Sequence, residues 1–515
     1  MKRIFTAYCS ILVVFCVQVM QAGSQEQKEI KEGEVIKRSF TQSAIYPGTT
    51  RDYWIYIPHE YTPNKPACLY VGMDGIPYNA PTVLDSLLAA KEVPVMIGVF
   101  VSSGTVFDTN GDVIRFNRSN EFDKMDDTFA RFILEELLPD FEKHRASDGR
   151  PLRLSKNPND RMLSGNSSGA ICAFTLAWQR PDMFRRVFSA IGTYVPMRGG
   201  NEYPPLIRKT EPKPLRIFLQ DGTKDTWNPL FGSWYEANVL MESALRFAGY
   251  DIAHEWGTGG HDDKHAAAIF PNVMRWLWRD WPEEIKKGIS ANDMLQRIID
   301  EEEPWEKVDL PFAPQELIAN SEGDLFSYNA EGMVFKLDKD GQVTPLSPLP
   351  PGEKLRHFLH ENKLCIHPFI HLFQEEDTHT ALFPNHKLLM QTEMHSHWIY
   401  SSVIGDEGKP VYKQRWYWLH NTDNRDIAPV GNICFDTGGN LYAATAMGIQ
   451  VCDQNGRVRA ILTLPSGSIT SVCFGGNGLR TLYAVSQGLL YKRKLNASGV
   501  TPDMPPIQLP PQGMG

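Results

Sequence analysis

Residues 161–178 read RMLSGNSSGAICAFTLAW, and this stretch decides the fold of the first half of the chain. An apolar pair, Met162-Leu163, precedes the pattern G-x-S-x-G at Gly165 to Gly169, and the helix-forming run Ala170 to Trp178 follows directly. Glycines at both flanks allow a strained strand-to-helix turn that exposes the central side chain. The pattern therefore predicts Ser167 as a nucleophile. A glycine-rich turn with incidental serines is the alternative, and the flanking strand and helix count against it.

Strand-like and helical segments alternate on both sides of this turn. The strand-like runs are rich in β-branched and aromatic residues: Tyr53 to Ile57, Cys68 to Val71, Val95 to Val101, Arg161 to Leu163, Val187 to Ile191 and Leu215 to Leu219. Helical spacing marks Thr82 to Ala90, Asp127 to Arg145, and a last helix around Pro271 to Trp281. Such alternation predicts an α/β domain at residues 34–282, with a mostly parallel sheet covered by helices on both faces. Together with the G-x-S-x-G turn, this arrangement is typical of an α/β hydrolase.

The length of 515 residues predicts a second folded body, because one hydrophobic core seldom serves so long a chain. Residues 283–312 are acidic and proline-flanked, with one short amphipathic stretch at Met294 to Ile299, and we interpret them as a linker. Residues 313–515 contain short alternating runs separated by turns such as Asn455-Gly456. This spacing predicts an all-β, partial propeller-like domain.

The amino terminus has the pattern of an export signal at residues 1–22. Lys2 and Arg3 precede an apolar run from Ile11 to Val19, and the small residues Ala22 and Gly23 follow. That run is shorter than the ~20 residues that span a bilayer, so no stable membrane anchor is expected. We therefore expect a protein that is exported to the periplasm or secreted.

The overall composition excludes some classes of function. The net charge is -9 and the basic residues are scattered, so the basic surface that nucleic-acid binding requires is not expected. Six cysteines lie beyond the signal, and their spacing matches no zinc site. Most of them sit in apolar runs, where a thiol behaves as a small hydrophobe. We expect buried free thiols, no bound metal and no cofactor.

A serine nucleophile needs a base, and the base works best when a carboxylate orients it. The acid should follow a later strand, and the loop after Leu215 to Leu219 contains both Asp221 and Asp225. Asp221 could instead form an Asx-type turn before Gly222, whereas Asp225 lies further out, where a loop can reach a histidine.

The base is expected on a loop before the last helix, where Gly257-Thr258-Gly259-Gly260 precedes His261. His254, in the preceding strand-like run, and His265, in the first helical turn, are expected to be structural. One oxyanion donor should be the backbone N–H of Ser168, and the other should come from the turn after Leu69 to Val71. The remaining candidates are Gly75 or Ile76 for that second donor and Trp227, Trp234 and Tyr235 for a substrate pocket.

With these residues placed, the segment Val35 to Trp281 resembles the esterase D and feruloyl esterase group, which also includes enterochelin esterases and mycolyltransferases. In that group the residues matching Ser167, Asp225 and His261 are nucleophile, acid and base, which ranks Asp225 above Asp221. Members act on feruloyl or acetyl groups of plant polysaccharide, on siderophore lactones and on simple esters. The likeness implies ester hydrolysis, and it lies in Thr50 to Pro58, Asp74-Gly75, Arg118 to Asp123, the turn at Ser167, Gly222 to Asp225 and Gly259 to His261.

The second domain resembles the gluconolactonase and senescence-marker family of calcium- or zinc-dependent six-bladed propellers. The likeness lies in Ser396 to Tyr400, Asn440 to Thr445, Gly448 to Asp453 and Phe474 to Gly476, and the length predicts four or five blades. The resemblance also implies lost metal ligands, since Gly431 replaces an aspartate and, by a looser alignment, Gln315 replaces a glutamate and Thr378 an asparagine. Divalent cations need anionic oxygen ligands, so we expect a non-catalytic domain.

The leading hypothesis is an exported serine esterase for feruloyl or acetyl esters of plant polysaccharide, including acetyl xylan. The rivals are a siderophore-ester hydrolase and a metal-dependent lactonase that uses the propeller domain. A third hypothesis makes the second domain a carbohydrate-binding module, with Trp398, Trp416 and Trp418 stacking on sugars.

Overall fold

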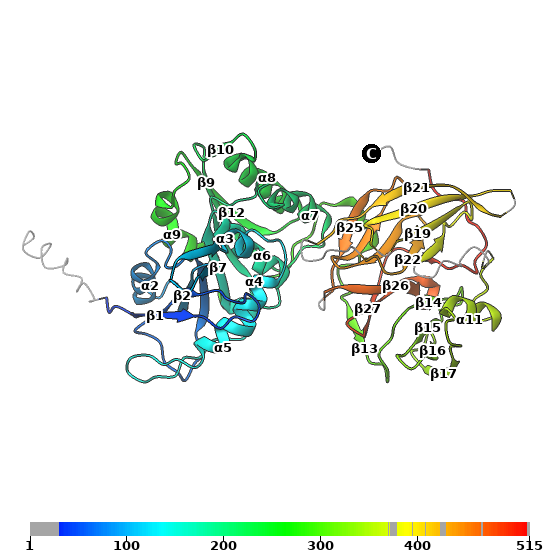
Figure 1. Cartoon of the computed structure of the whole chain (residues 1–515), viewed down its shortest axis with the longest axis horizontal. Helices are drawn as coiled ribbons and strands as arrows, with labels where there is room; N and C mark the ends of the chain where they lie inside the picture. Colours follow the sequence, from blue (N-terminus) through cyan, green and yellow to red (C-terminus); the bar gives the residue numbers. More distant parts are fainter. Residues whose placement is uncertain are drawn as a thin grey trace, which may run out of the picture.

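The computed structural model describes residues 30–368, 370, 379–393, 395–406, 408–422, 429–464 and 467–511. Figure 1 shows two bodies side by side, an α/β body followed by an all-β body. The expected signal at residues 1–22, like Thr378, lies outside the described residues. No helix of the described part is both long and apolar enough to cross a membrane.

The α/β body is built on one eight-stranded sheet with the order β1-β2-β4-β3-β7-β8-β9-β12. The first two strands run antiparallel to their neighbours, and the other six are parallel. The predicted, mostly parallel sheet is therefore confirmed. The bounds are β1 Glu34–Phe40, β2 Arg51–Ile57, β3 Cys68–Met73, β4 Met96–Val101, β7 Arg161–Asn166, β8 Arg186–Ala190, β9 Arg216–Gly222 and β12 Asp251–Gly257.

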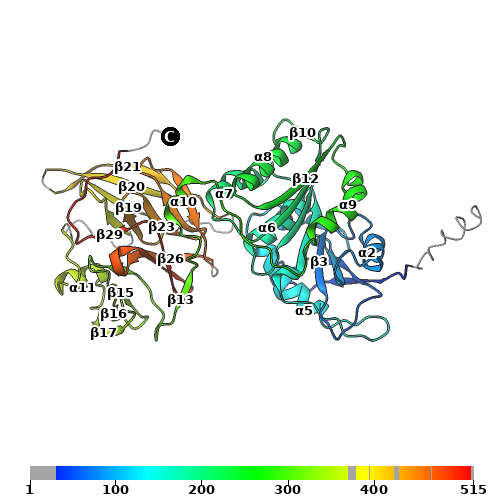
Figure 2. The same cartoon turned by 180° about the vertical axis from the view of Figure 1, so that it is seen from behind.

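Helices cover both faces of this sheet, as the two hydrophobic clusters show. One face packs against α6 (Ser168–Gln179), α8 (Trp234–Phe247) and the segment that begins with α4 (Thr128–Arg131), continues as a π-helix over Phe132–Leu137 and ends with α5 (Leu138–Phe141). The other face packs against α2 (Ala80–Ala89) and α9 (Lys264–Leu277), which Figure 2 shows together on the outer side. The helix predicted to reach Arg145 ends at Phe141.

The last helix of the α/β body differs from the sequence expectation. It begins at Lys264 and ends at Leu277, whereas Pro271 to Trp281 was expected. Pro271 lies inside the helix, and the buried positions Ala266, Ile269 and Phe270 precede it at helical spacing. The bounds expected around Pro271 to Trp281 thus lie too far along the chain, because the apolar stripe continues upstream of the proline, while His265 does lie in the first turn of the helix as expected.

Residues 283–312 are packed against both bodies: Ile285 and Ala291 donate backbone hydrogen bonds to Asn159 and Phe247 of the α/β body, and the later residues pack on the second body. They contain α10 (Asp293–Ile298) and β13 (Glu306–Val308). The side chain of Asn292 caps α10 by accepting hydrogen bonds from the backbone N–H groups of Met294 and Leu295. Met294, Leu295 and Ile298 are buried in the same cluster as strands of the all-β body. The amphipathic stretch seen in the sequence thus belongs to the core of the second domain.

The all-β body contains four antiparallel sheets within the described residues, which agrees with the predicted fold class. The strand β13, which precedes the first of these sheets in the chain, pairs with β28 and so completes the last. The first sheet contains β14 Ile318–Ala319, β15 Leu325–Tyr328, β16 Met333–Leu337 and β17 Val343–Pro348, and the second contains β18 Thr380–Leu382, β19 Leu388–Thr392, β20 Trp398–Ile404 and β21 Pro410–Trp418. The third contains β22 Ile433–Asp436, β23 Leu441–Thr445, β24 Gly448–Cys452, β25 Val458–Leu462 and β29 Gly499–Val500. The last contains β26 Ile469–Gly475, β27 Thr481–Ser486 and β28 Leu489–Lys494, besides β13.

The two bodies meet along α7 (Tyr203–Lys209). Leu206 of this helix is buried in a cluster with side chains of the all-β body, including Ile461. The next residue after the helix, Thr210, forms an isolated bridge with Ile461, and the backbone N–H of Glu211 donates to the Ile461 carbonyl at 3.1 Å. Main chain and apolar side chains therefore both cross the junction.

Candidate active site

The turn between β7 and α6 holds Ser167 in a strained conformation. Its φ of 56° and ψ of -121° lie in a region of backbone conformation that residues other than glycine seldom adopt. A Cβ at Gly165 would lie 2.3 Å from the backbone carbonyl of Gly169, so only glycine fits beneath the start of the helix. The N–H of Ser167 donates to the Ala190 carbonyl at 3.0 Å, which fixes the turn to the neighbouring strand β8. This is the strand, turn and helix that the sequence pattern predicts.

Three predicted side chains lie in one hydrogen-bonded row. Ser167 Oγ is 2.9 Å from His261 Nε2, and His261 Nδ1 is 2.7 Å from Asp225 Oδ1. The carboxyl group of Asp225 is fully buried, while the imidazole of His261 keeps 30% of its surface exposed. Burial alone would raise the pKa of Asp225, but the hydrogen bonds from His261 and the Thr226 amide, together with the neighbouring Asp221 side chain, outweigh burial and hold this pKa below its ordinary value.

Backbone contacts join the acid loop to the histidine loop. The N–H groups of Thr223 and Lys224 donate to the carbonyls of Gly257 and Gly259 at 2.9 and 3.1 Å. A Cβ at Gly222 would lie 2.2 Å from the Gly259 carbonyl oxygen, so the two loops pass too closely for any side chain there. The glycines near His261 therefore set the distance between the base and the acid.

Asp221 does not contact His261. It is fully buried, and its Oδ1 accepts a hydrogen bond from the Gly222 N–H at 2.6 Å, which is a local turn contact of the kind anticipated from the sequence. Its Oδ2 accepts from Asn238 Nδ2 of α8 at 2.8 Å. Burial, reinforced by the neighbouring carboxyl of Asp225, raises the pKa of Asp221 to about 8.

The two other histidines near the site make different contacts. His265 lies in the first turn of α9, where Nδ1 is 3.1 Å from Gln220 Nε2 and Nε2 is 3.3 Å from a carboxylate oxygen of Glu255. His254 lies in β12 with its ring stacked on Trp256 at a centroid distance of 4.7 Å. Neither ring has a recorded hydrogen bond to Ser167 among the described contacts.

The expected oxyanion turn lies against the start of α6. A Cβ at Gly169 would lie 3.0 Å from an Asp74 carboxylate oxygen, and Asp74 itself has a φ of 65°. Arg118 of α3 (Arg118–Phe122) binds this carboxylate through two hydrogen bonds of 2.9 and 2.8 Å, which holds the turn in place. The N–H of Gly75 donates to the Val101 carbonyl at 3.4 Å, so Ile76 is the better of the two candidates for the second donor. Ser168, the other expected donor, is the first residue of α6.

The three aromatic pocket candidates are separated in the structure. Trp234 is buried beside the row, with its ring 5.9 Å from the His261 ring. Trp227 lies in β10 (Trp227–Asn228), which pairs with β11 (Gly232–Ser233), and is 70% exposed. Tyr235 packs edge-on against Trp256 at 5.9 Å. Only Trp234 contacts the row directly.

Sequence reasoning missed Thr193. Its Oγ1 is 3.1 Å from Ser167 Oγ and accepts a hydrogen bond from Trp234 Nε1 at 3.2 Å. Because Trp234 donates to it, the Thr193 hydroxyl is free to donate its own proton to Ser167. The signal that could have found it is its position just after β8, whose carboxyl end lies beside the turn that holds Ser167.

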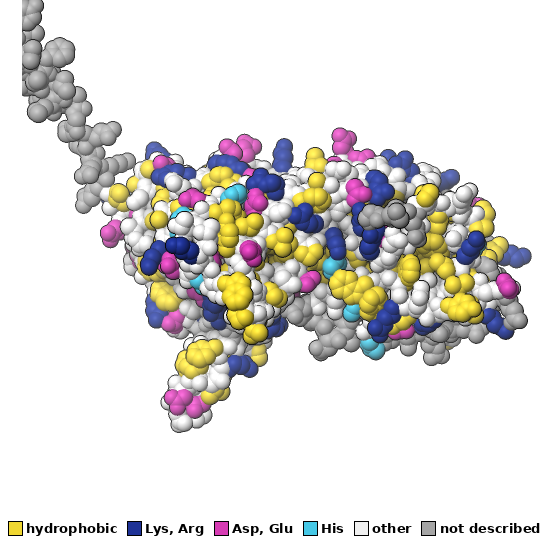
Figure 3. Space-filling model, turned by 90° about the horizontal axis from the view of Figure 1, so that it is seen from above, with side chains coloured by type: hydrophobic (Ala, Val, Ile, Leu, Met, Phe, Trp, Pro, Cys, Tyr) yellow, Lys and Arg dark blue, Asp and Glu magenta, His cyan; other side chains and the backbone are white. Residues whose placement is uncertain are grey.

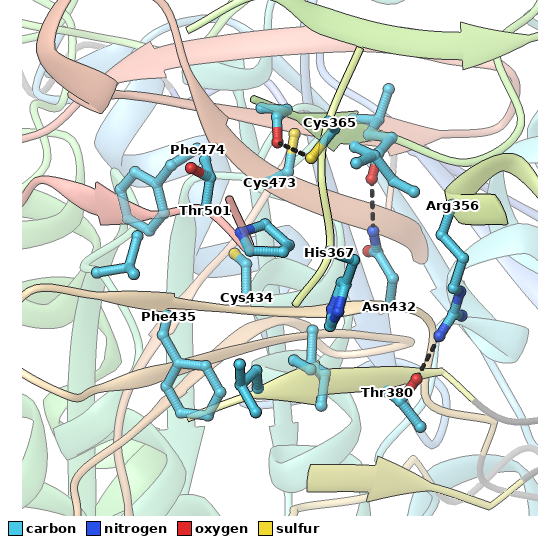
Figure 4. Close-up of a pocket in the computed structure, with 18 of the residues that line it drawn as sticks. Arg356, Cys365, His367, Thr380, Asn432, Cys434, Phe435, Cys473, Phe474 and Thr501 are labelled. Carbon is cyan, nitrogen blue, oxygen red and sulfur yellow. Dashed lines mark hydrogen bonds between the residues drawn. The ribbon is translucent and has the colours of Figure 1, made fainter. Parts of the chain in front are cut away.

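The all-β body has a cavity of about 100 Å³ where its four sheets meet. One strand of each sheet contributes to its wall, namely β14, β18, β22 and β26. Figure 4 shows Arg356, which donates to the Thr380 hydroxyl, opposite three cysteine sulfurs and two phenylalanine rings. Asn432 crosses between sheets, since its Nδ2 donates to the Leu317 carbonyl at 2.9 Å. Within the described residues no three His, Cys, Asp or Glu side chains are grouped so as to hold a metal ion.

Gly431 and Gln315, the described positions matched to metal ligands by the resemblance, do not present a carboxylate to the cavity. A Cβ at Gly431 would lie 2.1 Å from the Thr470 carbonyl oxygen, so no side chain can project there. The backbone N–H of Gln315 donates to Tyr328, and the next residue, Glu316, lines the cavity instead. The nearest recorded partner of the Glu316 carboxylate is His379 Nδ1 at 3.9 Å.

Comparisons with known protein families give one match in the α/β body and one in the all-β body. The sequence model of the family described as "Putative esterase" matches residues 45–307, slightly more than half of the chain. The model described as "SMP-30/Gluconolactonase/LRE-like region" matches residues 381–488. A search of curated proteins finds no match.

Solved structures with a similar fold include three esterases. A ferulic acid esterase is 16% identical, with a TM-score of 0.38, and the match covers 48% of this chain and 99% of that one. The enterobactin esterase of Shigella flexneri with enterobactin is 20% identical, with a TM-score of 0.37 and coverage of 48% and 59%. The feruloyl esterase module of Clostridium thermocellum complexed with sinapinate is 14% identical, with a TM-score of 0.35 and coverage of 49% and 90%.

Proposed function

We propose, from the premise that the chain belongs to the Esterase family, that it hydrolyses carboxylic esters by a serine acyl-enzyme mechanism centred on Ser167. The observation that carries this proposal is the row of two hydrogen bonds, 2.9 Å from Ser167 to His261 and 2.7 Å from His261 to Asp225. These distances are those that a nucleophile, its base and an orienting acid require.

The proposed reaction has two halves. His261 takes the proton of the Ser167 hydroxyl as the oxygen attacks the ester carbonyl, and then gives it to the leaving alcohol. Water, activated by the same imidazole, then releases the acid from the acyl-enzyme. The N–H groups of Ser168 and Ile76 stabilise the negative oxygen of each tetrahedral intermediate. Asp225 stays ionised and keeps the Nδ1 proton of His261 in place.

For the substrate we propose a feruloyl or acetyl ester carried by plant polysaccharide, met after export from the cell. Apolar side chains around the row support an acyl group with an aromatic ring: Trp234 borders His261, and Ile76 is 39% exposed beside the proposed oxyanion turn. A siderophore lactone is the competing ester, and it has the same reactive carbonyl.

A substrate panel tests this proposal. Purified wild type and Ser167→Ala are assayed in parallel on a small aryl acetate, a feruloyl ester, acetyl xylan and a siderophore lactone. We expect wild type to turn over the aryl acetate and the feruloyl or acetylated polysaccharide ester, and Ser167→Ala to lose at least roughly a thousandfold on each. Equal activity of the two proteins would refute Ser167 as the nucleophile. A preference for the lactone would replace the proposed substrate, and fractionation of producing cells tests the export.

Repeating the panel with a chelator distinguishes the esterase from a metal-dependent lactonase in the second body. A chelator should leave a serine triad unaffected, whereas it should stop a reaction that depends on a divalent cation. Lactone hydrolysis that survives Ser167→Ala and disappears with chelator would place a second activity in the all-β body.

A second proposed function, carbohydrate binding, has its own observation. Trp398 and Trp418 are cross-strand partners on β20 and β21, and Trp418 is 46% exposed. Arg415 lies 5.7 Å from the Trp398 ring and Lys413 lies 4.9 Å from the Tyr400 ring, so cations border the aromatic row. Aromatic faces of this kind stack on sugar rings.

The position of this row favours a polysaccharide chain as its ligand. Trp418 also lines a cleft of about 530 Å³ between the two bodies. β20 and β21 lie at the same side of the molecule as β10, which follows the acid loop (Figure 1). Figure 3, which views that side, shows apolar side chains and histidines close together near the junction. A chain bound there would extend toward the body that carries Ser167.

Retention on insoluble xylan or pectin tests the binding. The full-length Ser167→Ala protein is compared with the same protein carrying Trp398→Ala and Trp418→Ala, and with a control carrying Leu489→Ala, a partly exposed residue on β28. We expect the double tryptophan variant to lose retention and the control to keep it. Equal retention of all three would refute a sugar-binding role for this row.

A further inference from the structure

Asp221 and Asp225 place two carboxyl groups together in a site that water does not reach. Asp221 is fully buried, and the carboxyl group of Asp225 has no exposed surface. The two residues belong to one turn, since the N–H of Asp225 donates to the Gly222 carbonyl at 2.9 Å. Two buried carboxylates side by side repel each other, so one of them is favoured to keep a proton.

The hydrogen bonds around Asp221 and Asp225 show which carboxylate oxygen lacks a donor. Asp225 Oδ1 accepts from His261 Nδ1 and from the Thr226 N–H. Asp225 Oδ2 is buried and, with both groups ionised, has no donor among the described residues. Asp221 accepts at both of its oxygens, from Gly222 and from Asn238. A buried acceptor without a donor costs free energy, and a proton on Asp221 removes that cost.

We propose that Asp221 is a carboxylic acid at neutral pH and donates its proton in a hydrogen bond to Oδ2 of Asp225. The catalytic meaning of this contact rests on the proposed function, because Asp225 acts there as the acid of the triad. The proton belongs on Asp221 because Asp225 faces the imidazole of His261, which becomes positive during the reaction and favours an ionised partner.

The surroundings of Asp221 support the neutral form. Burial and the negative charge of Asp225 raise the pKa of Asp221 to about 8, and the hydrogen bond that the two side chains share contributes to this rise. α8 presents the uncharged Asn238 and Trp234, and β12 presents Trp256, which pairs with Asp221 in the sheet register. Among the described residues, the ionisable group recorded as acting on Asp221 is thus Asp225, and His261 lies beyond it at Oδ1 of Asp225.

Asp221 is therefore a positioning residue rather than a catalytic one. Its proton holds Oδ2 of Asp225 in place, so that Oδ1 stays directed at Nδ1 of His261. Its neutrality also limits the negative charge near His261 to one carboxylate. A second charge would stabilise the imidazolium form of His261, which has to be neutral before each attack.

The pH profile of two variants tests the role. Asp221→Asn keeps a neutral donor of nearly the same shape, whereas Asp221→Leu has no donor. We expect the kcat of wild type to decline above about pH 8, where Asp221 ionises. We expect Asp221→Asn to keep kcat within about threefold at pH 7 and to lack this decline, because nothing at this position then ionises. We expect Asp221→Leu to lose roughly ten- to a hundredfold in kcat with little change in KM. An unchanged alkaline decline in Asp221→Asn, or a loss as large as that of Asp221→Leu, would overturn the proposal.

Two further readouts do not depend on any activity. The infrared difference spectrum between wild type and Asp221→Asn should contain the C=O band of a protonated carboxyl at neutral pH. The folded-state pKa of Asp221 is above its ordinary value of 3.8, so the stability that its proton contributes is present below that value and is lost as the pH rises through about 8. Asp221→Asn should lack this loss. If both readouts fail, the proton is absent. If both readouts show the proton on Asp221 but the protein hydrolyses none of the esters, the proposed function alone is wrong.

Discussion

Arg493 of β28 donates to the carboxylate of Glu211, just beyond α7, at 2.8 Å, and the guanidinium group is almost completely buried between the two bodies. Lys287 lies 3.0 Å from the other oxygen of the same carboxylate. The junction therefore contains a charge network as well as the apolar contacts of Leu206. Arg493 and Glu211 depend on each other, because both side chains are largely buried, whereas Lys287 is partly exposed and also pairs with Glu301.

Replacing Glu211 by Gln should destabilise the protein by about 3–5 kcal/mol, since Arg493 would then be a buried charge without its counterion. The midpoint of urea unfolding, followed by tryptophan fluorescence, measures this loss. Glu306→Gln is the matched control, because the Glu306–Lys492 pair is largely exposed and should contribute less than about 1 kcal/mol. Equal midpoints for the two variants would show that the buried pair does not stabilise the junction.

Asp225→Asn should lower kcat roughly 10³- to 10⁴-fold, because an amide in this position favours the wrong tautomer of His261. Asp262→Asn, one residue after His261 and exposed, should leave activity unchanged. Steady-state kinetics on an aryl acetate distinguishes the two. If Asp225→Asn stayed active and Asp221→Asn did not, the acid would have to be reassigned to Asp221.

Gly222→Ala should separate the acid loop from the histidine loop, because the added Cβ would lie 2.2 Å from the Gly259 carbonyl oxygen. We expect a loss of at least roughly a hundredfold in kcat, as a misplacement of about 1 Å at a reacting group can cause. Gly259→Ala adds the same methyl group on the facing loop, where no atom lies within 4 Å. That control should keep near-normal activity, and a similar loss in both variants would contradict the steric explanation.

Thr193→Val should remove the hydrogen bond to Ser167 and leave Trp234 Nε1 without its acceptor. We expect a destabilisation of about 1–3 kcal/mol from the unsatisfied indole N–H, together with a several-fold fall in kcat. Thr193→Ser keeps the hydroxyl and should restore both properties. Thermal unfolding and kinetics on the same preparations check this, and a valine variant with wild-type stability would show that the indole contact is unimportant.

The sequence predicted the parts of the fold that depend on local pattern. The turn at Ser167 was readable because two glycines, an apolar strand and a helix stand next to one another in the chain. The parallel sheet followed from the alternation of strands and helices. The helix α9 begins upstream of Pro271, because Ile269 and Phe270 continue the apolar spacing that packs on the sheet, and only the expected position of His265 in its first turn matched this start.

The candidate site was only partly predictable, for a physical reason. Ser167, His261 and Asp225 stand in recognisable loops, but Thr193 and Asn238 contribute through contacts between elements that are distant in sequence. No local pattern marks a residue that acts through a hydrogen bond to an element distant in sequence. The role of Asp221 was open for the same reason, because its two partners come from the next residue and from a helix 17 positions away.

The pairing of β13 with β28 has a consequence for how the chain is made. Synthesis produces Glu306 to Val308 almost two hundred residues before Leu490 to Lys492, its partners in the register. Until those partners leave the ribosome, the all-β body has an open end and an unpaired strand edge, which is the condition in which chains associate with one another. The second half of the protein can thus finish folding only after Leu490 to Lys492 have been synthesised, while the α/β half ahead of it can already be complete. A gene fragment that starts at residue 313 would never encode the strand that closes it.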